Sequence, residues 1–426
     1  MNGYDRRTFT RGWNVAVAIL LALGGAACDS LLEVDDPVNL TPDDLAGEAP
    51  VDLTINGVRG AFQEMMDNYV LHTGLLVDEF VASGTFPYRQ EIDERTIPTN
   101  NQGLLGELYT PLSVARFMAD TGAVVLEEAL TSGSGADRTQ LEQGIALAKY
   151  FGGFTRVLLA EAMCESPIAG GASLSSDDRM RDALEVLRDA ESAAQAVGNA
   201  ELVAAARLGQ ARAHLWLKEY ALAATAAAKV PEGLAFKAYY SNNTVGQFNR
   251  VADVTHALND VIRWTVGDGT IKAVGYEKWP YFDEWVSLGL LVPRPDLESF
   301  NPLIPVVLQT KYTTGNAHIV VASGAEARLI VAEERLRAND ASGAAAILND
   351  LRQDWDLGPI TLSGSLSDKL RVLARERARE LWLTGERMGT LRRLLGDGID
   401  LFPAGHSGNA TCFPLPERET DTNPNA

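Results

Sequence analysis

The residues best suited to metal or nucleophilic chemistry are spaced in a way that favours neither. The H-E-x-x-H or H-x-H pair of a zinc hydrolase does not occur among His72, His214, His256, His318 and His406. No C-x-x-C redox or metal spacing occurs among Cys28, Cys164 and Cys412, and the chain has no G-x-S-x-G elbow and no Walker loop. The sequence therefore predicts no catalytic residue, no cofactor and no metal site.

Carboxylates are the ionisable groups in excess. The 426 residues include 57 Asp and Glu against 37 Lys and Arg, a formal net charge of -20. A glycosidase needs two carboxylates at a set separation, and the sequence neither excludes nor nominates such a pair. Phosphate binding needs Lys and Arg to displace counterions, so nucleic acid is not expected as a partner.

Aromatic side chains form the other candidate site. One cluster lies among Gly and Pro residues and comprises Tyr276, Trp279, Tyr281, Phe282 and Trp285. Phe86-Pro87-Tyr88 lies in an earlier loop-like segment, 84–103. Either these rings fill the base of an irregular subdomain, or one or two of them line a groove and stack on sugar faces or apolar groups. The hypothesis for ligand contact names Tyr88, Trp279, Tyr281 and Trp285.

The N-terminus has the pattern of an export signal. Arg6, Arg7 and Arg11 precede an apolar run at 15–23 that is too short to cross a bilayer, and small residues lead to Cys28. This predicts a signal peptide over 1–27. Asp5-Arg6-Arg7-Thr8-Phe9 also resembles a twin-arginine signal, so the Sec and twin-arginine routes both stay open.

Cys28 resembles the lipidated cysteine of a bacterial lipobox, with Gly25 where a Leu is usual. The alternative is ordinary cleavage that leaves Cys28 free. Lipidation predicts an anchored tether over 28–50 and leaves Cys164 and Cys412 in an oxidising compartment. These two are either bridged or buried as free thiols.

The remaining chain is mostly helical in character. Segments 177–197 and 199–219 are rich in helix formers, and Asn199 is a plausible N-cap. A long final helix is predicted over 367–395, with Gly385 on its buried stripe. No stretch after the signal is long and apolar enough for a transmembrane helix.

Two helical hairpins 121 residues apart resemble each other. Ala206-Arg207-Leu208 aligns with Ala327-Arg328-Leu329, as in tetratricopeptide-type repeats. Since the hairpins are separated rather than tandem, a continuous solenoid is not predicted. The segment between them, 231–322, is rich in Gly, Pro and aromatic residues and is predicted to be a loop-rich subdomain, where binding residues usually lie.

Motifs spread over the mature chain resemble those of the SusD/RagB family of outer-membrane nutrient-binding lipoproteins. They are Cys28-Asp29-Ser30-Leu31-Leu32, Lys311-Tyr312, Leu348-Asn349-Asp350-Leu351-Arg352, Glu376-Arg377-Ala378-Arg379-Glu380-Leu381, Gly385-Glu386-Arg387 and Phe413-Pro414-Leu415-Pro416. The resemblance implies an all-α, SusD-like fold with tetratricopeptide-like hairpins. Its helical N-terminal part would span 51–230, and its C-terminal part 231–426 would carry the loop-rich insertion 231–322.

The resemblance also implies a function. Such a protein is lipid-anchored in the outer membrane, binds an oligosaccharide or peptide and delivers it to a SusC-like TonB-dependent transporter, without chemistry of its own. Two alternatives are a tetratricopeptide-like scaffold lipoprotein that binds other envelope proteins, and a surface glycan hydrolase.

Overall fold

Helices make up most of the structure. The computed structural model describes residues 50–132, 137–256, the backbone of 264–265, and 281–426. The predicted signal peptide, the tether, Cys28 and Trp279 lie outside the described residues. Within them the all-α prediction is confirmed, because the strands are short and form only two-stranded pairs.

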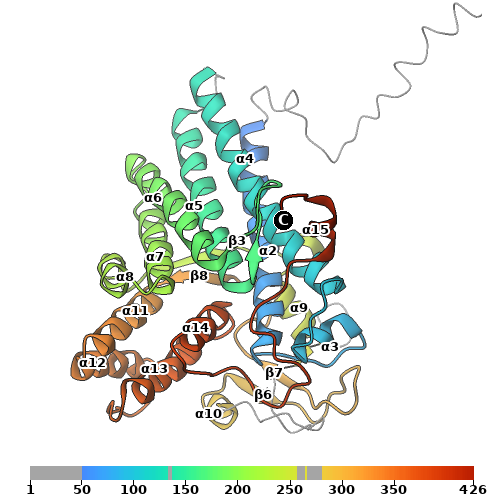
Figure 1. Ribbon diagram of the computed structural model, residues 1–426, viewed down its shortest axis with the longest axis vertical. Helices are drawn as coiled ribbons and strands as arrows, with labels where there is room; N and C mark the ends of the chain where they lie inside the picture. The colour runs from blue at the N-terminus through green and yellow to red at the C-terminus, as the bar shows by residue number, and fades with distance from the viewer. Residues whose placement is uncertain (1–49, 133–136, 257–263, 266–280) are drawn as a thin grey trace, which may run out of the picture. The chain divides into compact units, whose positions relative to one another are not determined.

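The first half of the chain contains the longest helices (Figure 1). Its elements are α2 (Pro50–Leu76), α3 (Pro87–Asp93), the π-helical η1 (Gly103–Tyr109), α4 (Thr110–Ser132), α5 (Arg138–Ala162), α6 (Ser176–Ala196), α7 (Ala200–Trp216) and α8 (Tyr220–Ala227). The second half contains η2 (Val245–Gln247), α9 (Arg250–His256), α10 (Phe282–Ser287), α11 (Gly324–Arg337), α12 (Ala341–Gln353), α13 (Leu366–Glu380), α14 (Glu386–Leu395) and α15 (Glu417–Thr422).

The strands of the described residues pair antiparallel. The pairs are β1 (Val81–Ala82) with β5 (Trp264–Thr265), β2 (Glu165–Ser166) with β3 (Leu174–Ser175), β4 (Ala235–Ala238) with β8 (Ile319–Ser323), and β6 (Leu291–Pro293) with β7 (Val307–Gln309). Two of the pairs, β1–β5 and β4–β8, join segments that are distant in sequence.

Local signals set several helix starts as the sequence predicts. The Asn199 side chain accepts a hydrogen bond from the Leu202 backbone N–H, so Asn199 is the N-cap of α7. The early loop-like segment, by contrast, contains the short helix α3, which begins with Pro87. Proline suits the first turn of a helix because its missing N–H has no partner there anyway.

The single long helix predicted over 367–395 is wrong, because the chain breaks into α13 and α14. Leu383 and Gly385 have φ values of +55° and +80°, which a helix interior does not accept. Gly385 is the N-cap of α14, and a Cβ there would lie 2.7 Å from the Tyr69 ring on α2. The glycine therefore allows both a left-handed turn and close packing.

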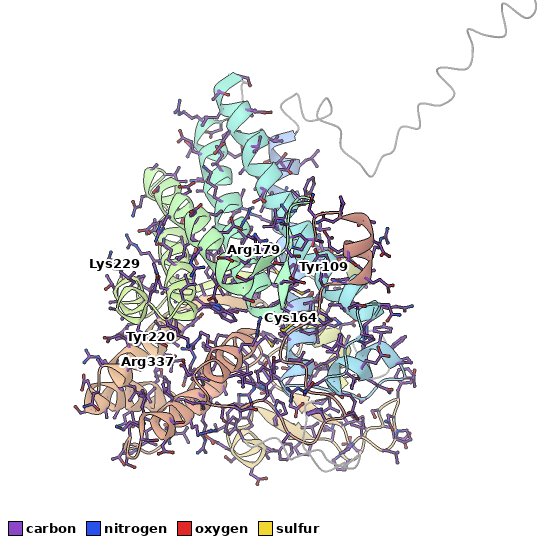
Figure 2. The ribbon with its side chains drawn as sticks, viewed as in Figure 1. Tyr109, Cys164, Arg179, Tyr220, Lys229 and Arg337 are labelled. Carbon is purple, nitrogen blue, oxygen red and sulfur yellow. A yellow bond between two sulfur atoms is a disulfide. The ribbon has the colours of Figure 1, made fainter. Side chains whose placement is uncertain are left out.

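The helical hairpins form a continuous array, contrary to the sequence prediction. Successive contacts run from α4 through α5, α6 and α7 to α8, and α8 packs directly on α11, which contacts α12 and α13 (Figure 1). The Arg337 guanidinium on α11 lies 4.1 Å from the Tyr220 ring centroid on α8 (Figure 2). The two hairpins are thus neighbours in space despite their separation in sequence.

The β4–β8 pair explains this continuity. The chain leaves α8, enters β4, and returns through β8 straight into α11, with Ala235 opposite Ser323. At this point Gly324 approaches so closely that a Cβ would lie 2.0 Å from the Glu232 carbonyl oxygen. The residues between β4 and β8 therefore leave and re-enter the helical array at one strand pair, which we call the β4–β8 neck. The array of helices is not interrupted.

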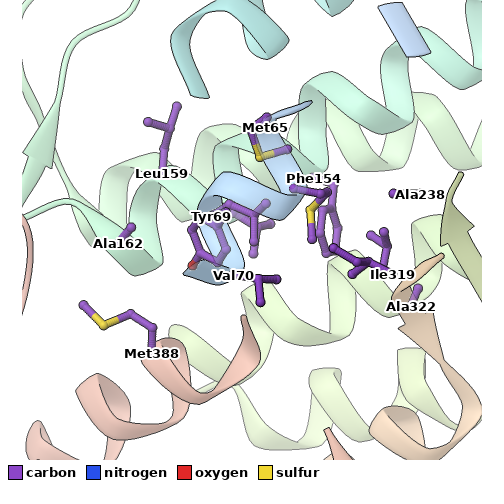
Figure 3. Packing of buried hydrophobic residues seen from close by; sticks show 14 of the residues in the cluster. Met65, Tyr69, Val70, Phe154, Leu159, Ala162, Ala238, Ile319, Ala322 and Met388 are labelled. Atoms are coloured by element: carbon purple, nitrogen blue, oxygen red, sulfur yellow. The ribbon is translucent and has the colours of Figure 1, made fainter. Parts of the chain in front are cut away.

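One large hydrophobic core joins these parts. In Figure 3, Met65 and Tyr69 of α2, Phe154 of α5, Ile319 of β8 and Met388 of α14 pack together. None of the helices in the described ranges combines the length and apolar composition needed to cross a bilayer.

Buried ion pairs cross the same region. Arg212 on α7 makes two hydrogen bonds to the Glu161 carboxylate on α5, at 2.7 Å and 2.5 Å, and its guanidinium lies 3.6 Å from Glu326 on α11. Arg377 pairs with Glu386 and not with Glu380, which lies three residues further along the same helix. The helix break between α13 and α14 places Glu386 beside Arg377, so the pair is buried and tertiary rather than local.

The C-terminal segment returns to the end of α5. Phe413 donates its N–H to the Ala162 carbonyl at 2.9 Å and accepts from the Cys164 N–H at 2.9 Å. Next to this bridge Cys164 and Cys412 form a disulfide, so of the two alternatives the structure has the bridged one (Figure 2).

Candidate ligand-binding site

Trp285 does not offer a surface to a ligand. Its side chain lies on α10 and is 0% exposed. The prediction that Trp285 contacts a ligand is therefore wrong, because helix α10 turns the ring into the core. Only the alternative interpretation, a ring that fills the base of the subdomain, fits this residue.

Tyr281 caps α10 and is partly buried. Its ring stacks on Trp285, with centroids 5.1 Å apart and planes 19° from parallel. The guanidinium carbons of Arg375 and Arg387 lie 5.8 Å and 6.0 Å from its centroid. Tyr281 therefore lies at the edge of the core, among cationic groups that favour an aromatic face.

Tyr88 is, with Tyr281, one of the two predicted ligand residues that are only partly buried within the described part of the chain. It lies in the first turn of α3, and its side chain is half-buried. The ring edge packs on Gly103 at the start of η1, where a Cβ would lie 2.8 Å from Tyr88 Cδ2. Asn101 Nδ2 donates to the Tyr88 carbonyl at 2.8 Å. Ring and backbone are thus both fixed, while part of the ring remains accessible.

Glu107 on η1 anchors this residue and its neighbours. Its carboxylate accepts hydrogen bonds from Tyr88 Oη at 3.2 Å, from Arg89 Nε and Nη2 at 3.1 Å and 2.8 Å, and it lies 2.9 Å from His72 Nε2. Although burial acts in the opposite direction, the hydrogen bonds and charges of His72 and Arg89 hold the pKa of Glu107 well below its usual range. Glu107 is therefore ionised. As a strong hydrogen-bond acceptor, its carboxylate holds the Tyr88 hydroxyl in place.

Phe86 adds a second ring to the same surface. The Phe86 and Tyr88 centroids are 5.5 Å apart with planes inclined at 39°, and the Arg89 guanidinium lies 4.8 Å from the Phe86 centroid. We call these two rings, with Arg89 and Glu107 behind them, the Phe86–Tyr88 surface. Two rigid aromatic rings on a fixed support supply contact area at little cost in side-chain entropy.

The described residues hold no group of three or more His, Cys, Asp or Glu side chains placed to bind a metal ion. At the Phe86–Tyr88 surface both oxygens of the Glu107 carboxylate are already paired. Glu107 therefore orients the Tyr88 and Arg89 side chains and is not placed to act as an acid or base. Sequence reasoning identified the aromatic residues but missed Glu107, Arg89 and His72. The association of Glu107 with Arg89 depends on the packing of η1 against α3, and His72 comes from α2, so no local spacing in the sequence indicates this group.

No protein-family model matches the sequence, and no curated protein matches it either. Solved structures do match over most of the chain. A SusD superfamily protein from Bacteroides thetaiotaomicron is 14% identical, with a TM-score of 0.66 over 89% of this chain and 98% of that one. A SusD-like protein from Bacteroides fragilis is 12% identical, with a TM-score of 0.65 over 91% and 97%.

A third similar structure is described as surface glycan-binding protein A from Bacteroides uniformis. It is 14% identical, with a TM-score of 0.61 over 88% of this chain and 98% of its own. These likenesses extend over nearly the whole length of both chains, as the motifs along the sequence predicted. The chain therefore has the fold of the SusD superfamily.

Proposed function

We propose that this protein binds a carbohydrate at its Phe86–Tyr88 surface. The observation that carries the proposal is the partly buried Tyr88 ring, held in place by the ionised Glu107. Flat, immobile rings suit the apolar faces of sugar rings, and the nearby polar groups suit their hydroxyls. Support comes from the fold, because two proteins that share it are described as a SusD-like carbohydrate binding protein and a surface glycan-binding protein.

The test is binding of glycans to the purified mature protein. A ligand that binds only the folded state raises stability by RT ln(1 + [L]/Kd), which is about 2.7 kcal/mol at a hundredfold excess over Kd. A thermal-shift screen against neutral and charged oligosaccharides and short peptides therefore identifies the ligand class. A peptide that stabilises the protein when no glycan does so would overturn the proposal.

Variants locate the site. Tyr88→Ala should weaken glycan binding by roughly 1–3 kcal/mol, the range of a hot-spot residue. Phe117→Ala, which removes a 55% exposed ring from α4, is the matched control and should leave affinity unchanged. Equal affinities for the two variants would show that the Phe86–Tyr88 surface is not the site.

We also propose that the protein is an outer-membrane lipoprotein that passes its ligand to a TonB-dependent transporter. The lipobox-like sequence at Cys28 and the SusD fold support this proposal. Cys28→Ala should release the protein from the membrane fraction in soluble form. Continued membrane association of that variant in high salt and without the transporter would contradict lipid anchoring.

Co-purification tests the partner. The protein solubilised in detergent from its own membranes should be recovered with a large outer-membrane transporter. Recovery with several unrelated envelope proteins, together with no stabilisation by any glycan or peptide, would favour the scaffold function instead. A released product from a bound glycan would favour a hydrolase.

A further inference from the structure

A second exposed aromatic ring lies at the neck of the inserted segment. In the antiparallel β4–β8 pair Ala238 is opposite Ile319. Tyr239 follows β4 and His318 precedes β8, so these two residues also come opposite each other. Their rings meet edge to face, with centroids 4.8 Å apart and planes at 61°. Tyr239 is nevertheless 54% exposed. The ring is thus supported on one side by His318, and the residue is largely open to solvent.

The support beneath this ring is rigid. The Tyr240 backbone N–H donates to His318 Nδ1 at 3.1 Å, and Tyr240 Oη donates to the Gln63 carbonyl of α2 at 2.8 Å. Burial and the nearby Lys237 lower the pKa of His318, which keeps the ring neutral. Because Nδ1 accepts a hydrogen bond, the proton of the neutral ring is on Nε2. This N–H has no acceptor among the described residues, so it is available to a ligand.

Two loops pack together beside Tyr239. Asn249 donates its backbone N–H to the Gly315 carbonyl and its side-chain amide to the Ala317 carbonyl, both at 2.8 Å. Gly315 lies so close to Asn242 that a Cβ would be 2.7 Å from the Asn242 amide oxygen. Residues 239–249 and 312–318 therefore form one surface around the exposed ring.

The composition of these two loops is unusual for this chain. Residues 239–249 and 312–318 contain no Asp, Glu, Lys or Arg, although 22% of the whole chain is charged. The exposed polar side chains are instead amides and hydroxyls, on Asn242, Asn243, Thr244, Gln247, Thr313, Thr314 and Asn316. Amides and hydroxyls both donate and accept hydrogen bonds, as the hydroxyls of a sugar do.

We infer that Tyr239, His318 and the amides Asn242 and Asn316 form a second binding surface, the Tyr239 surface, for a neutral saccharide. The two loops themselves offer no ion pair to an anionic or cationic ligand, because Lys237 and Arg250 flank them and lie outside them. The exposed ring offers a stacking face, and the amides and hydroxyls offer matched hydrogen-bond partners to an uncharged sugar. The inference rests on the proposed function in one respect, namely that the protein binds carbohydrate. It adds two statements to that function. The binding site is separate from the Phe86–Tyr88 surface, and the ligand is uncharged.

The test is affinity electrophoresis of the mature protein in gels that contain neutral polysaccharides (amylopectin, xyloglucan or galactomannan) or the anionic polygalacturonate. The wild-type protein should be retarded by at least one neutral polysaccharide and not by polygalacturonate. Tyr239→Ala should weaken that retardation by about tenfold or more, and Tyr239→Phe should retain most of it because the ring is preserved. Neither variant should change the melting temperature, since the side chain is largely exposed.

The outcomes separate this inference from the proposed function. Retardation of Tyr239→Ala equal to that of the Phe117→Ala control, alongside weakened retardation of Tyr88→Ala, overturns the Tyr239 surface alone. Stronger retardation by polygalacturonate overturns the neutral class of ligand. Absence of retardation of the wild-type protein by every polysaccharide, with no thermal shift from any oligosaccharide, overturns both proposals together.

Discussion

Asp67 on α2 should make the protein less stable as the pH rises. The side chain is 1% exposed, and its Oδ2 accepts a hydrogen bond from the Arg250 backbone N–H at 3.0 Å. Oδ1 has no hydrogen-bond partner among the described residues. Burial therefore raises the pKa of Asp67 from 3.8 to about 8, since the Arg250 N–H and charge offset only part of the cost of desolvation.

The size of the effect follows from linkage. The unfolded chain loses this proton near its ordinary pKa of 3.8, whereas the folded chain keeps it up to about pH 8. A raised pKa in the folded state means that the stabilising contribution is complete at low pH and is lost as the pH rises towards 8. At about 1.36 kcal/mol for each pH unit, Asp67 alone should remove about 4 kcal/mol of stability between pH 5 and pH 8.

Asp67→Asn isolates this contribution, because the amide keeps an acceptor oxygen for Arg250 but cannot ionise. The free energy of unfolding of the variant and the wild-type protein should be measured with urea at pH 5 and pH 8. The difference between them should shift by about 4 kcal/mol in favour of the variant at the higher pH. Asp52→Asn, which changes an exposed residue on the same helix, is the control. A difference that does not depend on pH would show that Asp67 is already ionised in the folded protein, and the reasoning would fail.

Three further predictions concern the interior. The Cys164–Cys412 bridge spans 248 residues, so changing both residues to Ser should lower the free energy of unfolding by about 5 kcal/mol; two alkylatable thiols in the non-reduced, unfolded protein would instead show that no bridge exists. Trp285→Ala should cost roughly 3–5 kcal/mol of stability in denaturant melts with unchanged glycan affinity, and the reverse result would return this ring to the ligand site. Arg212→Met should cost roughly 3–5 kcal/mol because it leaves Glu161 as an uncompensated buried charge, and adding Glu161→Gln should recover a large part of that loss; additive losses in the same melts would contradict this coupling.

The helical part of the fold could be predicted from the sequence because its signals are local. Asn199 caps a helix within three residues of its own position, and helix formers continue through α7. The break at Gly385 could not be predicted in this way. A glycine on a buried stripe is compatible with close helix packing, and only its positive φ and the nearby Tyr69 ring show that the helix ends there.

Long-range pairing limited the rest of the prediction. The continuity of the helical array depends on Ala235 lying opposite Ser323, a contact across 88 residues that no periodic pattern indicates. The site shows the same limit. The aromatic residues were identified by type, but the burial of Trp285 and the anchoring of Tyr88 by Glu107 depend on which elements pack together.

The β4–β8 neck affects how the length and sequence of the inserted segment can vary between proteins of this fold. Because Ala235 and Ser323 are strand partners, the ends of the insertion are held at the spacing of a hairpin, whatever lies between them. The entropy of closing a loop grows only with the logarithm of its length, so each doubling costs about 0.6 kcal/mol. Exposed loops between the two strands can therefore be lengthened or shortened at small cost to the helices, whereas buried residues of the insertion such as Trp285 and Tyr240 must keep their packing. A new binding surface can be acquired by replacing one segment, while the scaffold that presents it keeps its own sequence.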